Sequence, residues 1–158
     1  MKYSFFISLL AFPFLTGFAS CEKDQPATSN SNSSNNENTI PMGGKIRIKV
    51  GAGTFTATLL NNETANKFRA MLPLTLKMSE LNGNEKYFDL TASLPGNASN
   101  PGTIQSGDLM LYGANTLVLF YKTFPTSYSY SKIGRIDDAT GLGQALGSNS
   151  VTITFEVQ

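Results

Sequence analysis

The chain has 158 residues but no histidine and only one cysteine, and these two counts limit the chemistry it can perform. Serine and cysteine nucleophiles are normally activated by an imidazole that accepts their proton. Zinc sites take most of their ligands from cysteine and histidine. The composition therefore excludes imidazole-activated hydrolases and the common zinc sites, and we expect no metal and no cofactor. Carboxylate, tyrosine or lysine chemistry remains open, as does catalysis by electrostatics without proton transfer.

The only cysteine, Cys21, follows a segment with the features of a secretory signal. Lys2 provides a positively charged start, and residues 5–15 form an apolar run that is too short to span a bilayer as a helix. We therefore predict a signal peptide over residues 1–20 and expect it to be absent from the mature protein.

The end of this segment resembles the lipobox of bacterial lipoproteins, in which the cysteine thiol is acylated and the cysteine becomes the first mature residue. Ala19 and Ser20 are the small residues expected directly before the cysteine, whereas Phe18 stands where leucine is usual. We predict lipidation at Cys21, which would anchor the protein in the bacterial cell envelope, at the outer membrane. The membrane leaflet is left open.

Residues 21–44 are predicted to be a disordered tether. They contain no aromatic residue, and positions 28–39 are almost all serine, asparagine or threonine, so this segment cannot bury enough apolar surface to fold. Beyond the first 20 residues, 11 basic and 11 acidic side chains balance. A chain without net charge gives no reason to expect nucleic acid as a partner.

Residues 45–158 are predicted to form one mainly β domain. The segments 45–50 and 151–157 alternate apolar and polar residues, which is typical of half-buried strands. Similar patterns predict six further strands, at 55–59, 74–79, 86–92, 108–112, 115–122 and 132–136. Short helices are expected after Asn62 and Asp138, each of which could cap one. Eight strands with crossovers too short for βαβ units favour a closed antiparallel barrel.

Three short motifs lie in this domain, at residues 104–108, 119–120 and 133–136, and a longer pattern runs from Gly107-Asp108 through Gly113-Ala114 to Lys122-Thr123-Phe124-Pro125. The three motifs resemble cyclophilins, and the longer pattern resembles a compact bacterial group of cyclophilin-like domains more closely still. Residues 104–108 read Ile-Gln-Ser-Gly-Asp, similar to the Ile-Gln-Gly-Gly-Asp of the family. Asn115-Thr116 followed by Leu119-Phe120 resembles the stretch leading to its paired phenylalanines, and residues 133–136 resemble its Phe-Gly-Lys-Val strand. The motifs occur in the family's order across the domain. The resemblance implies a closed eight-stranded cyclophilin-like barrel with two short helices.

Cyclophilins isomerise X-Pro peptide bonds, a reaction with a barrier of about 18–20 kcal/mol that requires no acid or base. The family's catalytic arginine falls on Asn97, which cannot supply a guanidinium charge. Its loss should remove about 2–4 kcal/mol of transition-state stabilisation, if it acts like an oxyanion-hole donor. Lys86 and Arg135 are the substitutes that could take its place. Further groove residues of the family fall on Gly102, Thr103, Pro125 and Tyr130.

Aromatic residues concentrate between positions 112 and 130, where residues 124–130 are expected to form a loop. We hypothesise a shallow site lined by Gln105, Tyr112, Phe120 and Tyr130 that takes an extended peptide, a protein or a glycan. The alternative is that Phe120 and Phe124 belong to the core and the tyrosines cover one end of the barrel with their hydroxyls in water.

The predicted function is that of a membrane-anchored, cyclophilin-like lipoprotein whose domain is a non-catalytic peptide- or ligand-binding module of the cell envelope. An envelope peptidyl-prolyl isomerase and a structural partner of another envelope protein are the alternatives.

Overall fold

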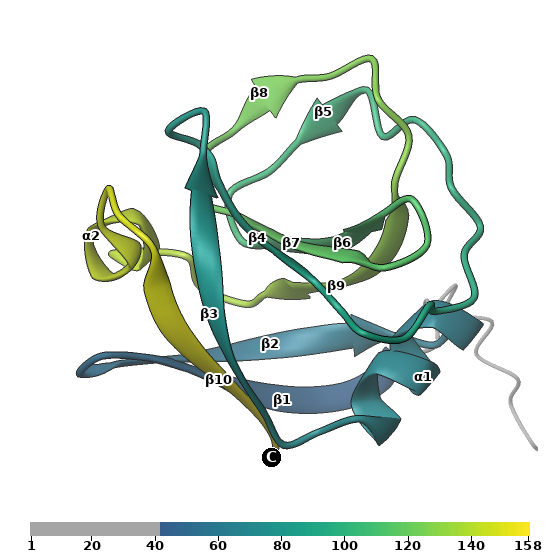
Figure 1. The fold of residues 1–158 in the computed structure, drawn as a ribbon, viewed down its shortest axis with the longest axis horizontal. Helices are drawn as coiled ribbons and strands as arrows, with labels where there is room; N and C mark the ends of the chain where they lie inside the picture. Colours follow the sequence, from purple (N-terminus) through teal and green to yellow (C-terminus); the bar gives the residue numbers. More distant parts are fainter. Residues whose placement is uncertain (1–41) are drawn as a thin grey trace, which may run out of the picture. The chain divides into compact units, whose positions relative to one another are not determined.

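The computed structural model describes residues 42–158 (Figure 1). The predicted signal over 1–20, Cys21 and most of the predicted tether lie outside the described residues. The first strand begins at Met42, so it includes three residues, 42–44, that the sequence analysis assigned to the tether.

Eight strands close into an antiparallel barrel in the order β1-β10-β3-β4-β7-β6-β9-β2. Their bounds are β1 Met42–Val50, β2 Gly53–Leu60, β3 Leu74–Leu81, β4 Glu85–Asp89, β6 Asp108–Tyr112, β7 Thr116–Phe120, β9 Ser131–Ile136 and β10 Val151–Val157. The prediction of a closed eight-stranded antiparallel barrel is confirmed. The barrel closes within residues 42–158, since all eight of its strands lie in this segment.

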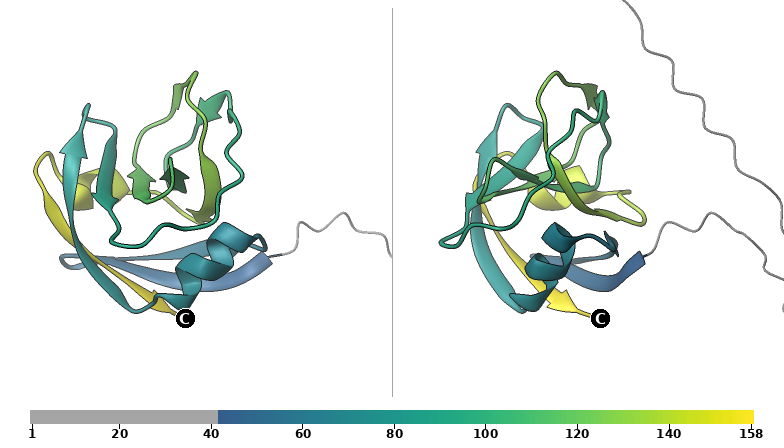
Figure 2. Two further views of the ribbon diagram at one scale, coloured as in Figure 1. Left: turned by 45° about the vertical axis from the view of Figure 1, so that its right-hand side comes forward. Right: turned by 90° about the vertical axis from the view of Figure 1, so that its right-hand side faces the viewer.

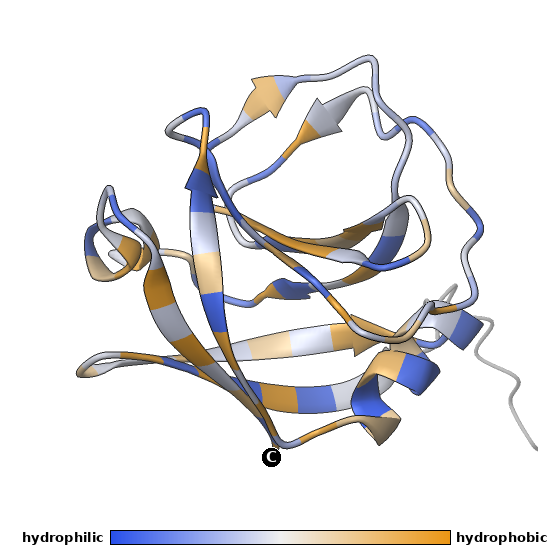
Figure 3. Cartoon of the chain, viewed as in Figure 1, coloured by the Kyte–Doolittle hydropathy of each residue, from blue (hydrophilic) through white to orange (hydrophobic). Residues whose placement is uncertain are grey.

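Alternate residues of each strand fill the barrel interior. On β1, Ile46, Ile48 and Val50 are buried, and the charged residues between them face outward. The alternation is visible along this strand in Figure 3. Outside the barrel, the Lys49 ammonium group lies 2.9 Å from Glu156 on the neighbouring strand β10. The positive residues of β1 therefore form a solvated outer face.

Strand β7 is buried on both faces, as the sequence predicts. Leu117 and Leu119 belong to the core inside the barrel. Val118 and Phe120 point outward into a second, smaller apolar cluster. Its other buried members are Ile104, Met110 and Tyr130. A strand with apolar residues on both faces needs cover outside the barrel as well as inside it.

A two-stranded ribbon supplies part of this outer cover. Strand β5 (Thr103–Ile104) pairs antiparallel with β8 (Phe124–Pro125). Figure 2 shows the ribbon standing over the barrel on the side away from β1 and β2. The prediction that residues 124–130 are all loop was wrong at this point. Strands of two residues are too short to show an alternating pattern, so the sequence contains no signal for them.

Helix α1 (Glu63–Ala70) begins as predicted. The Asn62 side chain caps it by accepting a hydrogen bond of 2.8 Å from the Ala65 N–H. Phe68 is fully buried and packs edge-on against Phe155 inside the barrel, with ring centroids 5.7 Å apart. The helix thus adds an aromatic side chain to the core.

Helix α2 (Leu142–Leu146) is shorter than predicted, and Asp138 does not cap it. The Asp138 carboxylate instead accepts a hydrogen bond of 2.9 Å from the Thr140 N–H within the preceding turn. Gly141 occupies the cap position in the left-handed conformation, with φ 78°. Asp138 therefore stabilises the turn that leads into the helix. Neither helix of residues 42–158 is long and apolar enough to cross a membrane.

Candidate ligand-binding site

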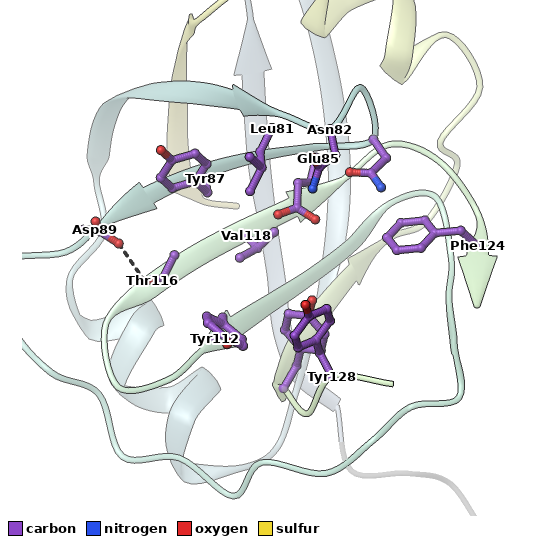
Figure 4. A pocket seen from close by; sticks show the side chains of 12 residues that line it. Leu81, Asn82, Glu85, Tyr87, Asp89, Tyr112, Thr116, Val118, Phe124 and Tyr128 are labelled. Carbon is purple, nitrogen blue, oxygen red and sulfur yellow. Dashed lines mark hydrogen bonds between the residues drawn. The ribbon is translucent and has the colours of Figure 1, made fainter. Parts of the chain in front are cut away.

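A cavity of about 400 Å³ lies on the outer face of β4 and β7 (Figure 4). Alternate residues of these strands form its floor: Tyr87 lies opposite Val118, and Asp89 lies opposite Thr116. The lining residues are Leu81, Asn82, Asn84, Glu85, Tyr87, Asp89, Tyr112, Thr116, Val118, Phe124, Tyr128 and Tyr130. The walls come from the β3–β4 turn on one side and from residues 124–130 on the other.

A chain of contacting aromatic rings forms the wall beside β6. The ring centroids of Tyr112 lie 6.1 Å from Tyr128 and 5.6 Å from Tyr130. Tyr130 also packs edge-on against Phe120 at 5.5 Å, and Phe120 lies 5.8 Å from Phe124. Edge-on and tilted contacts at these distances are favourable for aromatic pairs. The packing gives the cavity one largely preformed aromatic side.

The structure brings together two of the four residues proposed from the sequence. Tyr112 and Tyr130 line the cavity, but Gln105 and Phe120 are not among its lining residues. Phe120 is fully buried beneath Phe124 and Tyr130, as the core alternative anticipated, whereas Phe124 is only partly buried and lines the cavity. The Gln105 backbone N–H donates a hydrogen bond of 2.8 Å to Asp108, which ties this residue to the start of β6.

Sequence reasoning missed the contribution of β4 to the cavity. Glu85, Tyr87 and Asp89 alternate along this strand and therefore share its outer face. The period-two pattern was a usable signal, but the sequence did not show that β4 would pair with β7 beneath the aromatic loop. Tyr128, 61% exposed, is a further lining residue; it belongs to the aromatic concentration at 112–130 but was not among the four proposed site residues.

The cavity carries negative charge and hydrogen-bond acceptors. Its charged lining residues in the described part of the chain are Glu85 and Asp89, with no lysine or arginine among them. Burial, together with the negative charge of nearby Glu80, raises the pKa of Glu85. Asp89 accepts a hydrogen bond of 2.6 Å from Thr116, which Figure 4 marks. The Asn84 side-chain oxygen is buried and has no hydrogen-bond partner within residues 42–158.

The position expected for a catalytic arginine lies elsewhere. Asn97 lines a second cavity of about 340 Å³, together with the first residues of α1 and with Ser131 of β9. Arg135 is half-exposed, and its guanidinium lies 3.7 Å from the Asp108 carboxylate. Neither residue lines the aromatic cavity.

Lys86, the other substitute considered for the arginine, points into the barrel. It is fully buried, forms an ion pair with Glu80, and donates hydrogen bonds to the carbonyls of Gly147 at 2.8 Å and Asn149 at 2.7 Å. All three donors of its ammonium group are therefore satisfied. Tyr121 completes the cluster by donating a hydrogen bond to Glu80 at 2.8 Å. Lys86 thus joins β4 to the segment after α2 and has no position in the cavity.

These features define a closed antiparallel barrel with an aromatic groove on its outer face. The model of a cyclophilin-like family matches residues 48–156, so the chain belongs to the cyclophilin-like family. A solved structure with a similar fold is that of a hypothetical protein from Archaeoglobus fulgidus, at a TM-score of 0.56 and 18% identity. The alignment covers 78% of this chain and 99% of the archaeal one. No curated protein matches the chain significantly.

Proposed function

We propose that this cyclophilin-like domain is a non-catalytic binding module that takes an extended peptide in the cavity over β4 and β7. The observation that carries the proposal is the cavity itself, with five aromatic side chains and no cationic one among its described lining residues. Preformed concave sites lined by aromatic side chains and a few polar groups are typical of ligand binding. Tyrosine is also among the residues that contribute most to peptide and protein recognition.

The same geometry argues against efficient prolyl isomerisation. A transition state that develops charge on the amide needs a preorganised donor or cation beside it. Lys86 and Arg135 are held by Glu80 and Asp108, away from the cavity. Phe120, the groove residue that the family resemblance implies, is covered by Phe124 and Tyr130. A prolyl ring could reach Phe120 only if these two side chains moved.

The domain is further proposed to work as the ligand-binding part of a bacterial envelope lipoprotein. Support for this comes from the sequence around Cys21, where small residues precede the cysteine at the end of an apolar run. A lipid anchor and a tether that ends before β1 at Met42 would hold the domain close to the membrane without restricting its orientation.

Two measurements on residues 42–158 test the binding function. In the first, a random-decapeptide phage library is selected against the domain, and the selected peptides are titrated while amide NMR shifts are followed. We expect shifts at Tyr87, Tyr112 and Tyr128, and weaker binding by Tyr112→Ala. Peptides that bind only elsewhere on the barrel would contradict the proposal.

The second measurement is an NMR exchange assay on the peptide Ala-Ala-Pro-Phe. We expect no acceleration of cis/trans exchange at domain concentrations where a cyclophilin control is fully active. A clear acceleration would favour the envelope isomerase. Co-purification of a stable envelope protein whose binding survives Tyr112→Ala would favour the structural-partner alternative.

A further inference from the structure

Two carboxylates only five positions apart, Glu80 and Glu85, differ in how their charge is compensated. Glu80 pairs with Lys86, accepts hydrogen bonds from Tyr121 and accepts another of 2.9 Å from the Gly83 N–H. Glu85 has no side-chain hydrogen bond or ion pair with any residue of the described domain, although it is half-buried. Because the Glu85 oxygens are not among the buried atoms without a partner, they remain accessible from the cavity and can accept hydrogen bonds from a ligand.

The side chain of Glu85 is directed into the cavity. Figure 4 shows its carboxylate above Val118, with Tyr87 to one side and Phe124 to the other. A second carboxylate, Asp89, lies farther along the same strand, and the partnerless oxygen of Asn84 belongs to the same lining. The Glu85 and Asp89 carboxylates accept hydrogen bonds at their oxygens and together favour a ligand that donates them.

The aromatic wall suits a positively charged donor in particular. Ammonium and guanidinium groups bind over tyrosine faces within about 6 Å of the ring centre, and the effect is stronger where water is excluded. Tyr87, Tyr112, Tyr128 and Tyr130 line the same cavity as Glu85. Lys122, whose ammonium group lies beside Gly83 in the β3–β4 turn, is not among the lining residues, so the described domain does not place its own cation there.

We propose that the cavity recognises a cationic group, an ammonium or guanidinium, held by the Glu85 carboxylate against the tyrosine rings. The inference rests on the proposed binding function and specifies its ligand. A volume of about 400 Å³ accommodates one long side chain or a small amine. The cation therefore comes either from a lysine or arginine of an extended peptide or from a free amine, and both sources share the same chemistry.

The test compares matched probes on residues 42–158 by NMR titration. The probes are blocked Ala-Ala-Lys-Ala-Ala, the same peptide with acetylated lysine, and n-butylammonium. We expect the lysine peptide to shift the cavity residues and its acetylated form to bind about tenfold more weakly, because acetylation removes the charge-assisted contact. Stronger binding of the peptide than of butylammonium identifies a peptide side chain as the source, whereas equal binding identifies a free amine.

The variant Glu85→Gln keeps the size of the side chain and removes its charge. We expect it to fold, to weaken the lysine peptide by about tenfold and to leave the acetylated peptide unchanged. Asp138→Asn is the control, because it makes the same change of net charge on an exposed carboxylate outside the cavity. It should bind the lysine peptide like the unaltered domain.

Any one of several results would overturn the inference. The lysine and acetyl-lysine peptides could bind equally, Glu85→Gln could leave binding of the lysine peptide unchanged, or a neutral sugar such as maltose could shift the cavity residues while the cations do not. Uncharged library peptides that bind in the cavity would also refute the cation preference but leave the proposed binding function intact. The absence of binding by every probe and every library peptide would refute both.

Discussion

At the scale of single residues, the β3–β4 hairpin carries two carboxylates with different surroundings. Glu80 is neutralised within the domain, whereas Glu85 is not. Lys86 and Glu80 neutralise each other at the barrel end, and Tyr121 adds a hydrogen bond and a ring 5.5 Å from the Lys86 ammonium group. Glu85, one position before Lys86, faces the opposite side of the strand and remains available. Alternation along one strand thus places a buried ion pair and a candidate binding group next to each other in sequence.

Lys86→Met should destabilise the domain by about 3–5 kcal/mol, the usual cost of breaking a buried ion pair by removing one partner. The loss arises because Glu80 keeps its charge and two carbonyls lose their donor. Urea unfolding of residues 42–158 measures the change. The double variant Lys86→Met with Glu80→Leu should recover much of the loss, and the exposed Lys77→Met should have little effect. A single variant as stable as the unaltered domain would contradict this account of the cluster.

The same cluster makes the free energy of unfolding depend on pH in the alkaline range. Burial and the hydrogen bond to Glu80 raise the pKa of Tyr121 from 10.0 to about 12. The folded domain therefore keeps the phenol proton at a pH where the unfolded chain has lost it. This contribution is fully present below pH 10 and is lost as the pH rises from 10 toward 12.

Urea midpoints measured at pH 9, 10 and 11 test this prediction. The unaltered domain should lose stability over this interval, and Tyr121→Phe should show a smaller decrease because it has no proton to lose. In the acidic range, the group of this cluster that matters is Glu80. Burial alone would raise the pKa of its carboxyl, but the hydrogen bonds from Lys86 and Tyr121 outweigh burial and lower that pKa. Its contribution is present above the unfolded pKa and is lost as the pH falls. Equal alkaline slopes for the two proteins would contradict the role of Tyr121.

At the scale of secondary structure, the sequence predicts strands that have a long alternating pattern and misses features that depend on tertiary pairing. The strands β1 and β10 and the Asn62 cap follow from local residue types. The β5–β8 ribbon and the late start of α2 do not, because two-residue strands and a turn made by Asp138 have no periodic signal. The same distinction between local patterns and tertiary pairing applies to the residues of the cavity. Tyr112 and Tyr130 lie in an evidently aromatic segment, whereas Glu85 and Tyr87 acquire their role only when β4 pairs with β7.

The close approach of β2 and β9 at Gly134 gives a prediction for element packing. A Cβ atom at this position would lie 2.5 Å from the Thr58 carbonyl oxygen, far inside normal contact. Gly134→Ala should therefore force the two strands apart and destabilise the domain by about 1–3 kcal/mol, as overpacking does in protein interiors. Thermal unfolding measures the loss, and amide exchange should locate it in β2 and β9.

Gly143→Ala is the matched control for this substitution. Its added Cβ would lie 3.5 Å from the Tyr121 ring, an ordinary contact, and alanine favours the helical conformation of α2. We expect this variant to be as stable as the unaltered domain or slightly more stable. An equal loss of stability in both variants would show that the approach of the strands is not the cause.

At the scale of the whole molecule, the domain has the closed barrel of the cyclophilin-like family. Its open cavity lies next to Phe120, and Phe120 itself does not line it. The ribbon and Tyr130 cover Phe120, and the space that remains open is bounded by β4, with its carboxylates and tyrosine. A change in a few covering side chains therefore alters what the outer face can bind without altering the closed sheet beneath it. Such a domain needs only to be held near its ligand, and a lipid anchor would do this.

The proposed lipid anchor is tested with residues 1–158 expressed in a bacterial host. Cys21→Ala removes the only thiol of the chain, so we expect it to abolish incorporation of an alkyne-labelled fatty acid and to move the protein from the membrane fraction to the soluble fraction. The reason is that each buried methylene of an acyl chain contributes about 0.8 kcal/mol of membrane affinity.

Ser20→Ala keeps a small residue before the cysteine and should be labelled normally, and Phe18→Leu, which introduces the usual lipobox residue, should be labelled at least as well. Because residues 42–158 contain the complete barrel, all three variants should keep the lysine-peptide binding of the domain. Continued labelling of Cys21→Ala would show that the lipid is attached elsewhere, and a membrane-bound but unlabelled Cys21→Ala would show that something other than an acyl chain holds the protein there.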